Sequence, residues 1–174
     1  MIERSDTLNN QAIILASGGN YVESIACFKR AITIDKNNYL LWYNLGITYR
    51  DAGENESARE ALIQAFQISP ENEEVIETLA TQCLSMGNLN EAVYYCNYGL
   101  ELNNANAHLW NLLGVCFFQE EMYIEASEGF EMALSLNPYY ADALLNLKDT
   151  YSELGNKNGV IECTMRLKEI KIHS

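Results

Sequence analysis

The residues that most often catalyse reactions or bind metals are few or scattered in this 174-residue chain. Of its two histidines, His108 has no cysteine or histidine at the spacing of a zinc site. The five cysteines form no C-x-x-C pair, and no nucleophile elbow, phosphate-binding glycine loop or dinucleotide fingerprint occurs. Carboxylates are numerous, but paired-carboxylate catalysis needs a closed site that raises one pKa. The sequence therefore predicts no catalytic residue, no metal site, no cofactor and no enzyme activity.

The acidic residues are unevenly distributed. The net charge is −13, from 24 acids and 11 bases, and no lysine or arginine occurs between Arg59 and Lys148. Such a field repels nucleic acid and anionic membrane and favours a cationic or neutral partner. Solvated acidic helix faces that serve only solubility are the alternative interpretation.

The termini and the cysteines bear on the cellular compartment. The first residues lack the basic segment and apolar run of a secretory signal, and every apolar run is far too short to span a membrane. The cysteines are odd in number and have apolar neighbours, as expected for reduced, buried thiols. These features predict a cytoplasmic protein.

Small residues recur with a period of 34 residues. They form three columns: Ala12, Gly46, Ala80 and Gly114; Ser24, Ala58, Ala92 and Ala126; and Ala31, Ala65, Gly99 and Ala133. Trp42 and Trp110 are separated by twice this period, as are Pro70 and Pro138. A fixed period of this length indicates a helical repeat protein. We expect five units, 5–38, 39–72, 73–106, 107–140 and 141–174, in a single domain over residues 1–174.

Each unit reads as two antiparallel helices of about 13 to 15 residues, because apolar residues follow a helical period on both sides of a turn. The turns contain a glycine that can end a helix in the left-handed conformation, and the fourth unit departs with Glu121 at this place. Ser69-Pro70 and Asn137-Pro138 are read as an N-cap followed by proline in a first helical turn. The small columns predict a close helix crossing, where a side chain at Gly46 or Gly114 would obstruct the partner helix.

Two units carry a family resemblance. Trp42-Tyr43-Asn44-Leu45-Gly46-Ile47-Thr48-Tyr49, followed by Ala58, Leu62, Ala65 and Pro70, resembles a nearly complete tetratricopeptide repeat (TPR), and the unit from Trp110 to Pro138 resembles a second. The fifth unit departs most, with Lys148 and Val160 at positions expected to be small. The resemblance implies an all-α fold, a right-handed solenoid of five antiparallel helix pairs whose first helices line a concave groove. It also implies binding of peptides or proteins without chemistry of its own.

The resemblance implies which residues face that groove, just before and after the small position of each first helix. The implied partner-binding residues are Asn10, Tyr43, Asn44, Ile47, Glu74, Glu77, Thr81, His108, Asn111, Phe118, Asp142 and Asn146. Asn10, Asn44 and Asn146 occupy one column, and a row of side-chain amides can hold a peptide main chain of any sequence. Thr78 and Leu112 interrupt this row, and an asparagine-rich chain that simply tolerates asparagine there is the alternative.

The charge of the implied groove indicates the kind of ligand. The positions of a two-carboxylate clamp read Asn9, Ile13, Asn44, Glu74 and Thr78, without a cation, which disfavours a ligand held by its terminal carboxylate. The acids of the implied groove instead predict a neutral to basic peptide, with Tyr43 and Phe118 as apolar or cation–π contacts. These acids are Glu74, Glu77, Asp142 and Asp149.

Three functions remain open at this point. The sequence favours a scaffold or adaptor that binds a peptide or helix in the groove, with no nucleic acid and no membrane as partner. The alternative is a structural protein that self-assembles through its terminal repeats, because Ile161, Met165 and Ile170 keep the last helix apolar. A third reading makes the chain a regulatory repeat region of an enzyme whose catalytic domain lies outside it.

Overall fold

The computed structural model describes residues 4–173, with side chains up to residue 170. The described residues form ten α-helices and no strand. The helices are α1 (Ser5–Ser17), α2 (Tyr21–Ile34), α3 (Tyr39–Asp51), α4 (Asn55–Ile68), α5 (Glu73–Ser85), α6 (Leu89–Leu102), α7 (Ala107–Gln119), α8 (Tyr123–Leu136), α9 (Ala141–Glu153) and α10 (Lys157–His173). The chain divides into two compact units, and the division lies between Met86 and Gly87.

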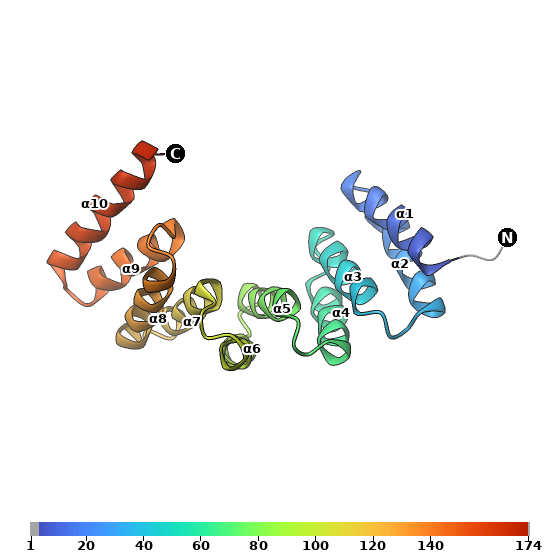
Figure 1. Ribbon diagram of the computed structural model, residues 1–174, viewed down its shortest axis with the longest axis horizontal. Coiled ribbons are helices and arrows are strands. Elements are labelled where there is room, and N and C mark those ends of the chain that lie inside the picture. Colours follow the sequence, from blue (N-terminus) through green and yellow to red (C-terminus); the bar gives the residue numbers. More distant parts are fainter. Residues whose placement is uncertain (1–3, 174) are drawn as a thin grey trace. The chain divides into compact units, whose positions relative to one another are not determined.

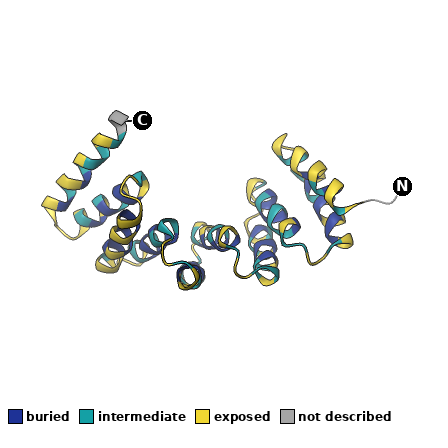
Figure 2. Cartoon of the chain, viewed as in Figure 1, coloured by how far each residue is buried: buried dark blue, intermediate teal, exposed yellow. Residues whose placement is uncertain are grey.

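The first unit contains α1 to α5, drawn from blue to green in Figure 1. Helix α1 packs on α2 and α3 on α4, while α2 also contacts α3 and α4 contacts α5. The core holds Leu8, Phe28, Leu41 and Leu45, each at most 3% exposed. Because each helix buries only one stripe of its surface, a single helix pair is completed by its neighbours (Figure 2).

The second unit contains α6 to α10 and repeats this pattern. Helix α7 packs on α8 and α9 on α10, while α6 contacts α7 and α8 contacts α9. Its core is built on Phe130, Leu144 and Leu147, with Cys163 of the last helix. The third repeat contributes α5 to the first unit and α6 to the second.

The helices follow the predicted period. The first helix of each repeat starts at the expected residue, which is Ser5, Tyr39, Glu73, Ala107 or Ala141. The prediction of an all-α protein made of antiparallel helix pairs is confirmed. The assignment of residues 1–174 to one domain stays a prediction.

The small residues lie where two helices approach each other most closely. Ala12, Ala58, Ala80 and Ala126 are fully buried. A Cβ added to Gly46 would lie 2.8 Å from Leu62 Cγ and 3.2 Å from the Ala58 oxygen, and one added to Gly114 would lie 2.7 Å from Phe130 Cε1. These distances are too short for a side chain, so the close crossing predicted from the sequence is confirmed.

The two tryptophans each fix the loop that precedes their own helix. The Trp42 Nε1–H donates to the Lys36 oxygen at 3.0 Å, and Trp110 Nε1–H donates to the Asn104 oxygen at 2.9 Å. Both bonds span six residues, so the same indole plays the same part in the second and fourth repeats. A buried or half-buried indole N–H requires such a partner.

The prediction of where helices begin near the two prolines is wrong. Ser69 and Asn137 are C-caps of α4 and α8, and their N–H groups donate to the oxygens of Ala65 and Ala133. Pro70 and Pro138 lie in the loops, where a residue without an N–H loses no helical hydrogen bond. The N-caps of α3, α5 and α7 are instead asparagines, Asn38, Asn72 and Asn106, whose side-chain oxygens accept from the first turn of each helix.

The turn inside the fourth repeat closes without glycine. Gly19, Gly53, Gly87 and Gly155 take φ between 69° and 81° at the equivalent turns, and Glu121 takes φ 60°. A side chain in this left-handed region is unfavourable.

None of the described helices is long and apolar enough to cross a membrane.

Candidate functional site

The first helices of the first unit are joined by an asparagine pair. Asn44 of α3 is half-buried, and its Nδ2 donates to Oδ1 of Asn9 on α1 at 3.0 Å. The bond fixes the orientation of both amides, and a side-chain amide has further donor and acceptor capacity beyond one such bond. Asn10, the residue that the sequence placed in one column with Asn44, is exposed and is not the partner.

A tyrosine joins α3 to α5 in the same unit. The Tyr43 hydroxyl donates to Oε1 of Glu74 at 3.1 Å and lies 3.1 Å from Oγ1 of Thr78. Burial raises the pKa of the Tyr43 hydroxyl, and the Glu74 carboxylate adds to this effect. The phenol therefore stays neutral and keeps Glu74 in place on the exposed side of α5.

The remaining predicted residues of this unit have separate surroundings. Ile47 is half-buried beside Asn44, and Glu77 is half-buried on α5. The Thr81 hydroxyl donates to the Glu77 main-chain oxygen at 2.8 Å, so it serves its own helix. The structure thus brings Tyr43, Asn44, Ile47 and Glu74 together on α3 and α5. The exposed Asn10 contacts the asparagine pair only through its Oδ1, which accepts from Asn9 Nδ2 at 3.4 Å.

A hollow of about 220 Å³ lies between α1 and α3, next to the asparagine pair. Phe28 of α2 is 1% exposed and forms part of its lining. The other lining residues are Ile13, Ala16, Ser17, Asn44, Ile47, Thr48 and Asp51. The hollow is therefore lined by both apolar side chains and polar groups, which include an amide, a carboxylate and two hydroxyls.

The second unit repeats the asparagine pair on α7 and α9. Asn146 Nδ2 donates to Asn111 Oδ1 at 3.0 Å, and Asn111 is 6% exposed. His108 Nδ1 lies 3.0 Å from the Tyr140 hydroxyl just before α9. Three of the predicted residues, His108, Asn111 and Asn146, thus connect neighbouring first helices in this unit.

Phe118 and Asp142 differ in their surroundings. The Phe118 ring is half-buried and packs edge-on against Tyr123, with ring centroids 5.4 Å apart. It lines a small hollow of about 60 Å³ with Val115, Phe130, Asn146 and Asp149. Asp142 is exposed in the first turn of α9, where a carboxylate also favours the helix N-terminus. A cation–π role for Phe118 stays a prediction.

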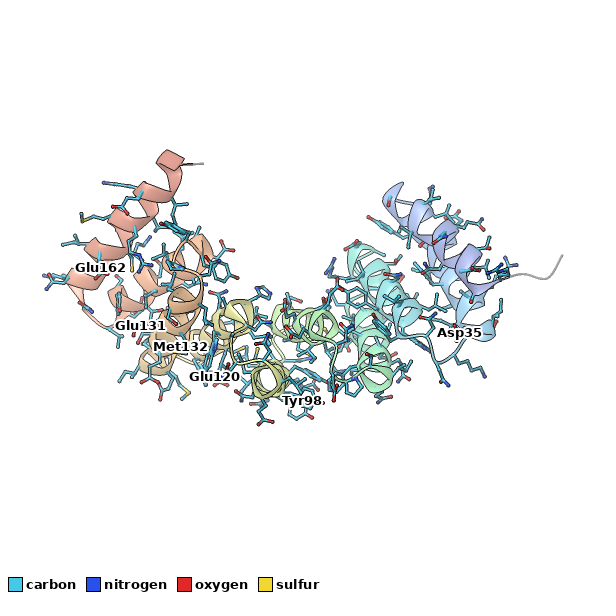
Figure 3. The ribbon with its side chains drawn as sticks, in the orientation of Figure 1. Asp35, Tyr98, Glu120, Glu131, Met132 and Glu162 are labelled. Atoms are coloured by element: carbon cyan, nitrogen blue, oxygen red, sulfur yellow. The ribbon has the colours of Figure 1, made fainter. Side chains whose placement is uncertain are left out.

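The second helices carry a different pair of hollows. One of about 500 Å³ lies over Tyr49 between α2 and α4, with Lys29 Nζ 5.6 Å from the Tyr49 ring centroid. The other, of about 390 Å³, lies at the equivalent place between α8 and α10, where the Tyr151 hydroxyl donates to Glu131 at 2.7 Å. Burial raises the pKa of the Tyr151 hydroxyl, and the Glu131 bond adds to it. Figure 3 shows Glu131 and Glu162 on this side of the second unit.

The side chains at these sites can bind a ligand through hydrogen bonds and through opposite charge. No cluster of three or more histidine, cysteine, aspartate or glutamate side chains that could hold a metal ion occurs in the part of the chain that the structure describes. The groups that meet on the first helices are amides, phenols and carboxylates, which bind main chains and cations.

The comparison with protein families concerns the same segments. Residues 14–50 match a TPR repeat model, and residues 39–72 match a tetratricopeptide repeat model. The protein is a tetratricopeptide repeat protein. The resemblance predicted from Trp42 to Pro70 is therefore confirmed.

Solved TPR structures have the same fold. MamA from Desulfovibrio magneticus superposes with a TM-score of 0.88 at 16% identity, over 98% of this chain and 96% of that chain. YrrB, described as a TPR protein with an unusual peptide-binding site, gives 0.76 at 23% identity, over 94% of this chain and 84% of its own. At these identities the likeness establishes the fold alone.

Sequence relatives are longer proteins. A peroxisomal targeting signal receptor of Candida albicans is 24% identical over 99 residues, which is 57% of this chain and 17% of the receptor. Cilia- and flagella-associated protein 70 of Homo sapiens is 27% identical over 121 residues, which is 68% of this chain and 11% of that protein. The TPR chain thus spans a quarter or less of the length of the curated relatives that it matches.

Sequence reasoning missed Tyr140, and it placed Asn9 and Thr78 at groove positions without pairing them with Asn44 and Tyr43. Asn9, Thr78 and Tyr140 are the partners of Asn44, Tyr43 and His108. The 34-residue period does not reveal these pairs, because each of the two asparagine bonds joins residues 35 apart. Neighbouring first helices are offset by one position, so a residue meets the one just before its repeat equivalent.

Proposed function

We propose that this TPR protein is a non-catalytic scaffold or adaptor of the cytoplasm, which binds a neutral to basic peptide or helix of a partner protein along its first helices. The asparagine pair Asn44–Asn9 carries the proposal, because it presents an oriented amide between two helices and recurs as Asn146–Asn111. The peptide-binding site in the description of YrrB supports the same use of the fold. Five buried free cysteines support a reducing compartment.

Binding would rest on groups that are already in place. Asn44 is held by Asn9, and Glu74 is held by Tyr43, so neither side chain must be ordered when the ligand arrives. Preorganisation lowers the entropic cost of binding. Asn44 would pair with the ligand main chain, and Glu74 would attract a lysine or arginine, which sets the preference for neutral to basic ligands.

The test is the affinity of the protein for a fluorescent library of lysine-containing peptides, measured by fluorescence anisotropy. The salt concentration is varied from about 0.05 to about 0.5 M, because the distance over which charges interact shortens as salt rises. We expect binding that weakens as salt rises, and a loss of about tenfold in the Asn44→Ala, Glu74→Gln double variant, because a hydrogen bond and a charge are removed. The matched control is Asn90→Ala with Glu56→Gln, which changes exposed residues of α6 and α4. Equal affinity of both double variants, or binding that ignores salt, would contradict the proposal.

Self-assembly through the terminal repeats is a second candidate. Ile161 and Met165 on α10 are 58% and 59% exposed, which gives the last repeat an apolar outer face. The first repeat differs, because Thr7 and Gln11 are exposed where the equivalent Leu41 and Leu45 of the second repeat are buried. The first repeat nonetheless exposes Ile14 and Val22, at 73% and 79%, so α10 of one copy has an apolar surface to contact on the first repeat of the next. Light scattering over a range of concentrations tests this, and Ile161→Asp with Met165→Asp should leave a monomer at every concentration.

A further inference from the structure

The hollows between the first helices are repeat equivalents of very different size. Ile13, Phe28 and Asn44 line the hollow of the first unit, and Val115, Phe130 and Asn146, each three periods later, line that of the second. The first hollow measures about 220 Å³ and the second about 60 Å³.

Among the matching lining positions, the largest difference in side-chain size is at one residue in each hollow. Ala16 of α1 lines the first hollow, and its equivalent three periods later is Phe118 of α7. The Phe118 ring packs beside the core of the second unit and edge-on against Tyr123. The second unit therefore fills with its own ring a space that the first unit leaves open above Phe28.

We propose that the α1–α3 hollow is the subsite for one bulky apolar side chain of a bound peptide, and that Phe118 closes the equivalent subsite in the second unit. The proposal rests on the peptide-binding function proposed above. The occupant is an extended peptide with an aromatic or large aliphatic residue close to a lysine or arginine.

Two observations decide this occupant. The space accepts an aromatic ring, because Phe118 occupies its equivalent among the matching residues Val115, Phe130 and Asn146. The charge near the hollow suits a lysine or arginine next to the apolar residue of the peptide, because Tyr43 holds the Glu74 carboxylate on α5. Asp51, which lines the hollow, is instead paired with Arg50 at 3.0 Å. Asn44, which lines the hollow, adds the main-chain partner.

The experiment uses the full chain and two pools of labelled octapeptides. Both pools contain one fixed lysine and random flanks, and they differ at one central position, which is phenylalanine in one pool and alanine in the other. Burial of one large apolar side chain predicts binding of the phenylalanine pool on the order of 10- to 100-fold tighter. Ala16→Phe should abolish this preference, and Ala16→Leu should reduce it.

The control is Ala26→Phe, the same change at an exposed position of α2, which should keep the preference. Methyl resonances of Ile13 and Ile47 should shift when the phenylalanine pool binds the parent protein, and should not shift in Ala16→Phe. In Phe118→Ala, whose folding is checked by circular dichroism, the Val115 methyls should shift as well and the stoichiometry should rise from one to two.

The outcomes separate this inference from the proposed function. If the parent binds both pools equally and loses both with Asn44→Ala and Glu74→Gln, the subsite is refuted and the peptide-binding function stands. If Ala16→Phe keeps the preference for phenylalanine, the apolar residue binds elsewhere and the inference is wrong. If the parent binds neither pool, the proposed function and the inference both fail.

Discussion

At the scale of single residues, the polar contacts between first helices depend on an offset of one position. Asn44 meets Asn9, Thr78 meets Tyr43 and Asn146 meets Asn111, and in each case the partner lies 35 residues earlier in the chain. Thr78 interrupts the asparagine column in the sequence, yet it still provides a hydroxyl at the junction of α3 and α5. The identity of the polar residue therefore varies between repeats, and the contact between neighbouring helices persists.

Glu121 offers a direct test of local backbone strain. Its φ of 60° is in the region that the other repeats reserve for glycine. We expect Glu121→Gly to raise the free energy of unfolding by up to about 1 kcal/mol, because relief of the left-handed conformation exceeds the entropy that glycine adds to the unfolded chain. Urea denaturation measures the change.

The reciprocal variant is Gly53→Glu, which puts the same side chain at φ 81° in the second repeat. It should lower the free energy of unfolding by about 1 kcal/mol or more. A Glu121→Gly variant that is less stable than the parent would show that Glu121 makes contacts that outweigh its strain.

At the scale of helices, the period predicted most of the fold, including the start of each first helix, but the residues that cap the helices were predicted wrongly near the prolines. The columns at Gly46 and Gly114 predicted which residues face the partner helix, because only a position pressed against another backbone excludes a side chain. The prolines misled, because a proline is acceptable both in a first helical turn and in the loop before it. Asn38, Asn72 and Asn106 recur at the same period and were the better signal for helix starts.

The close approach also involves a glycine that the columns did not contain. A Cβ added to Gly129 on α8 would lie 3.0 Å from Gly114 Cα on α7. The column at Gly129 holds Cys27, Ala61, Tyr95 and Cys163 in the other repeats, so no pattern marks it. Its role depends on the depth of one helix crossing, which composition alone does not define.

Gly46→Ala and Gly114→Ala test this crossing. Each alanine gains about 1 kcal/mol of helix propensity, and loses about 1–3 kcal/mol because Leu62 and Phe130 are fully buried and must move. We expect both variants to melt at lower temperature in circular dichroism. In Gly114→Ala, the added Phe130→Leu should cost less than Phe130→Leu alone, because the smaller side chain makes room for the new methyl group.

Asn97→Ala is the control for helix propensity, since Asn97 is exposed on α6. It should be neutral or stabilising. Additive effects of Gly114→Ala and Phe130→Leu would mean that the two residues do not compete for space.

At the scale of the whole molecule, composition determines the charge and predicted the buried thiols, whereas the assignment of the chain to one domain stays a prediction. The net charge of −13 and the five cysteines follow from composition, and all five cysteines are buried. The division between Met86 and Gly87 has no signal in the sequence, because the third repeat matches the same period on both sides of it. Repeat patterns report contacts between neighbouring helices, and they do not report where the chain divides into compact units.

The buried thiols provide a measure of stability in each unit. Cys27 and Cys83 belong to the first unit, and Cys96, Cys116 and Cys163 to the second. Burial raises the pKa of Cys116 to about 11, and burial also raises the pKa of Cys163. Since the thiolate is the nucleophile, we expect alkylation by iodoacetamide at pH 8 to require local opening of the fold, and to proceed far more slowly than in denaturant.

The raised pKa of Cys116 also sets a direction for the pH dependence of stability. An unfolded thiol ionises near pH 8.5, whereas the folded one stays neutral until about pH 11. The contribution of Cys116 to stability is therefore complete below pH 8.5 and is lost as the pH rises toward 11. Cys116→Ala should show a smaller fall in melting temperature than the parent between pH 8 and pH 10.5. An equal fall in both proteins would show that other groups control alkaline stability, and fast alkylation of Cys116 at pH 8 would show that α7 opens without unfolding of its unit.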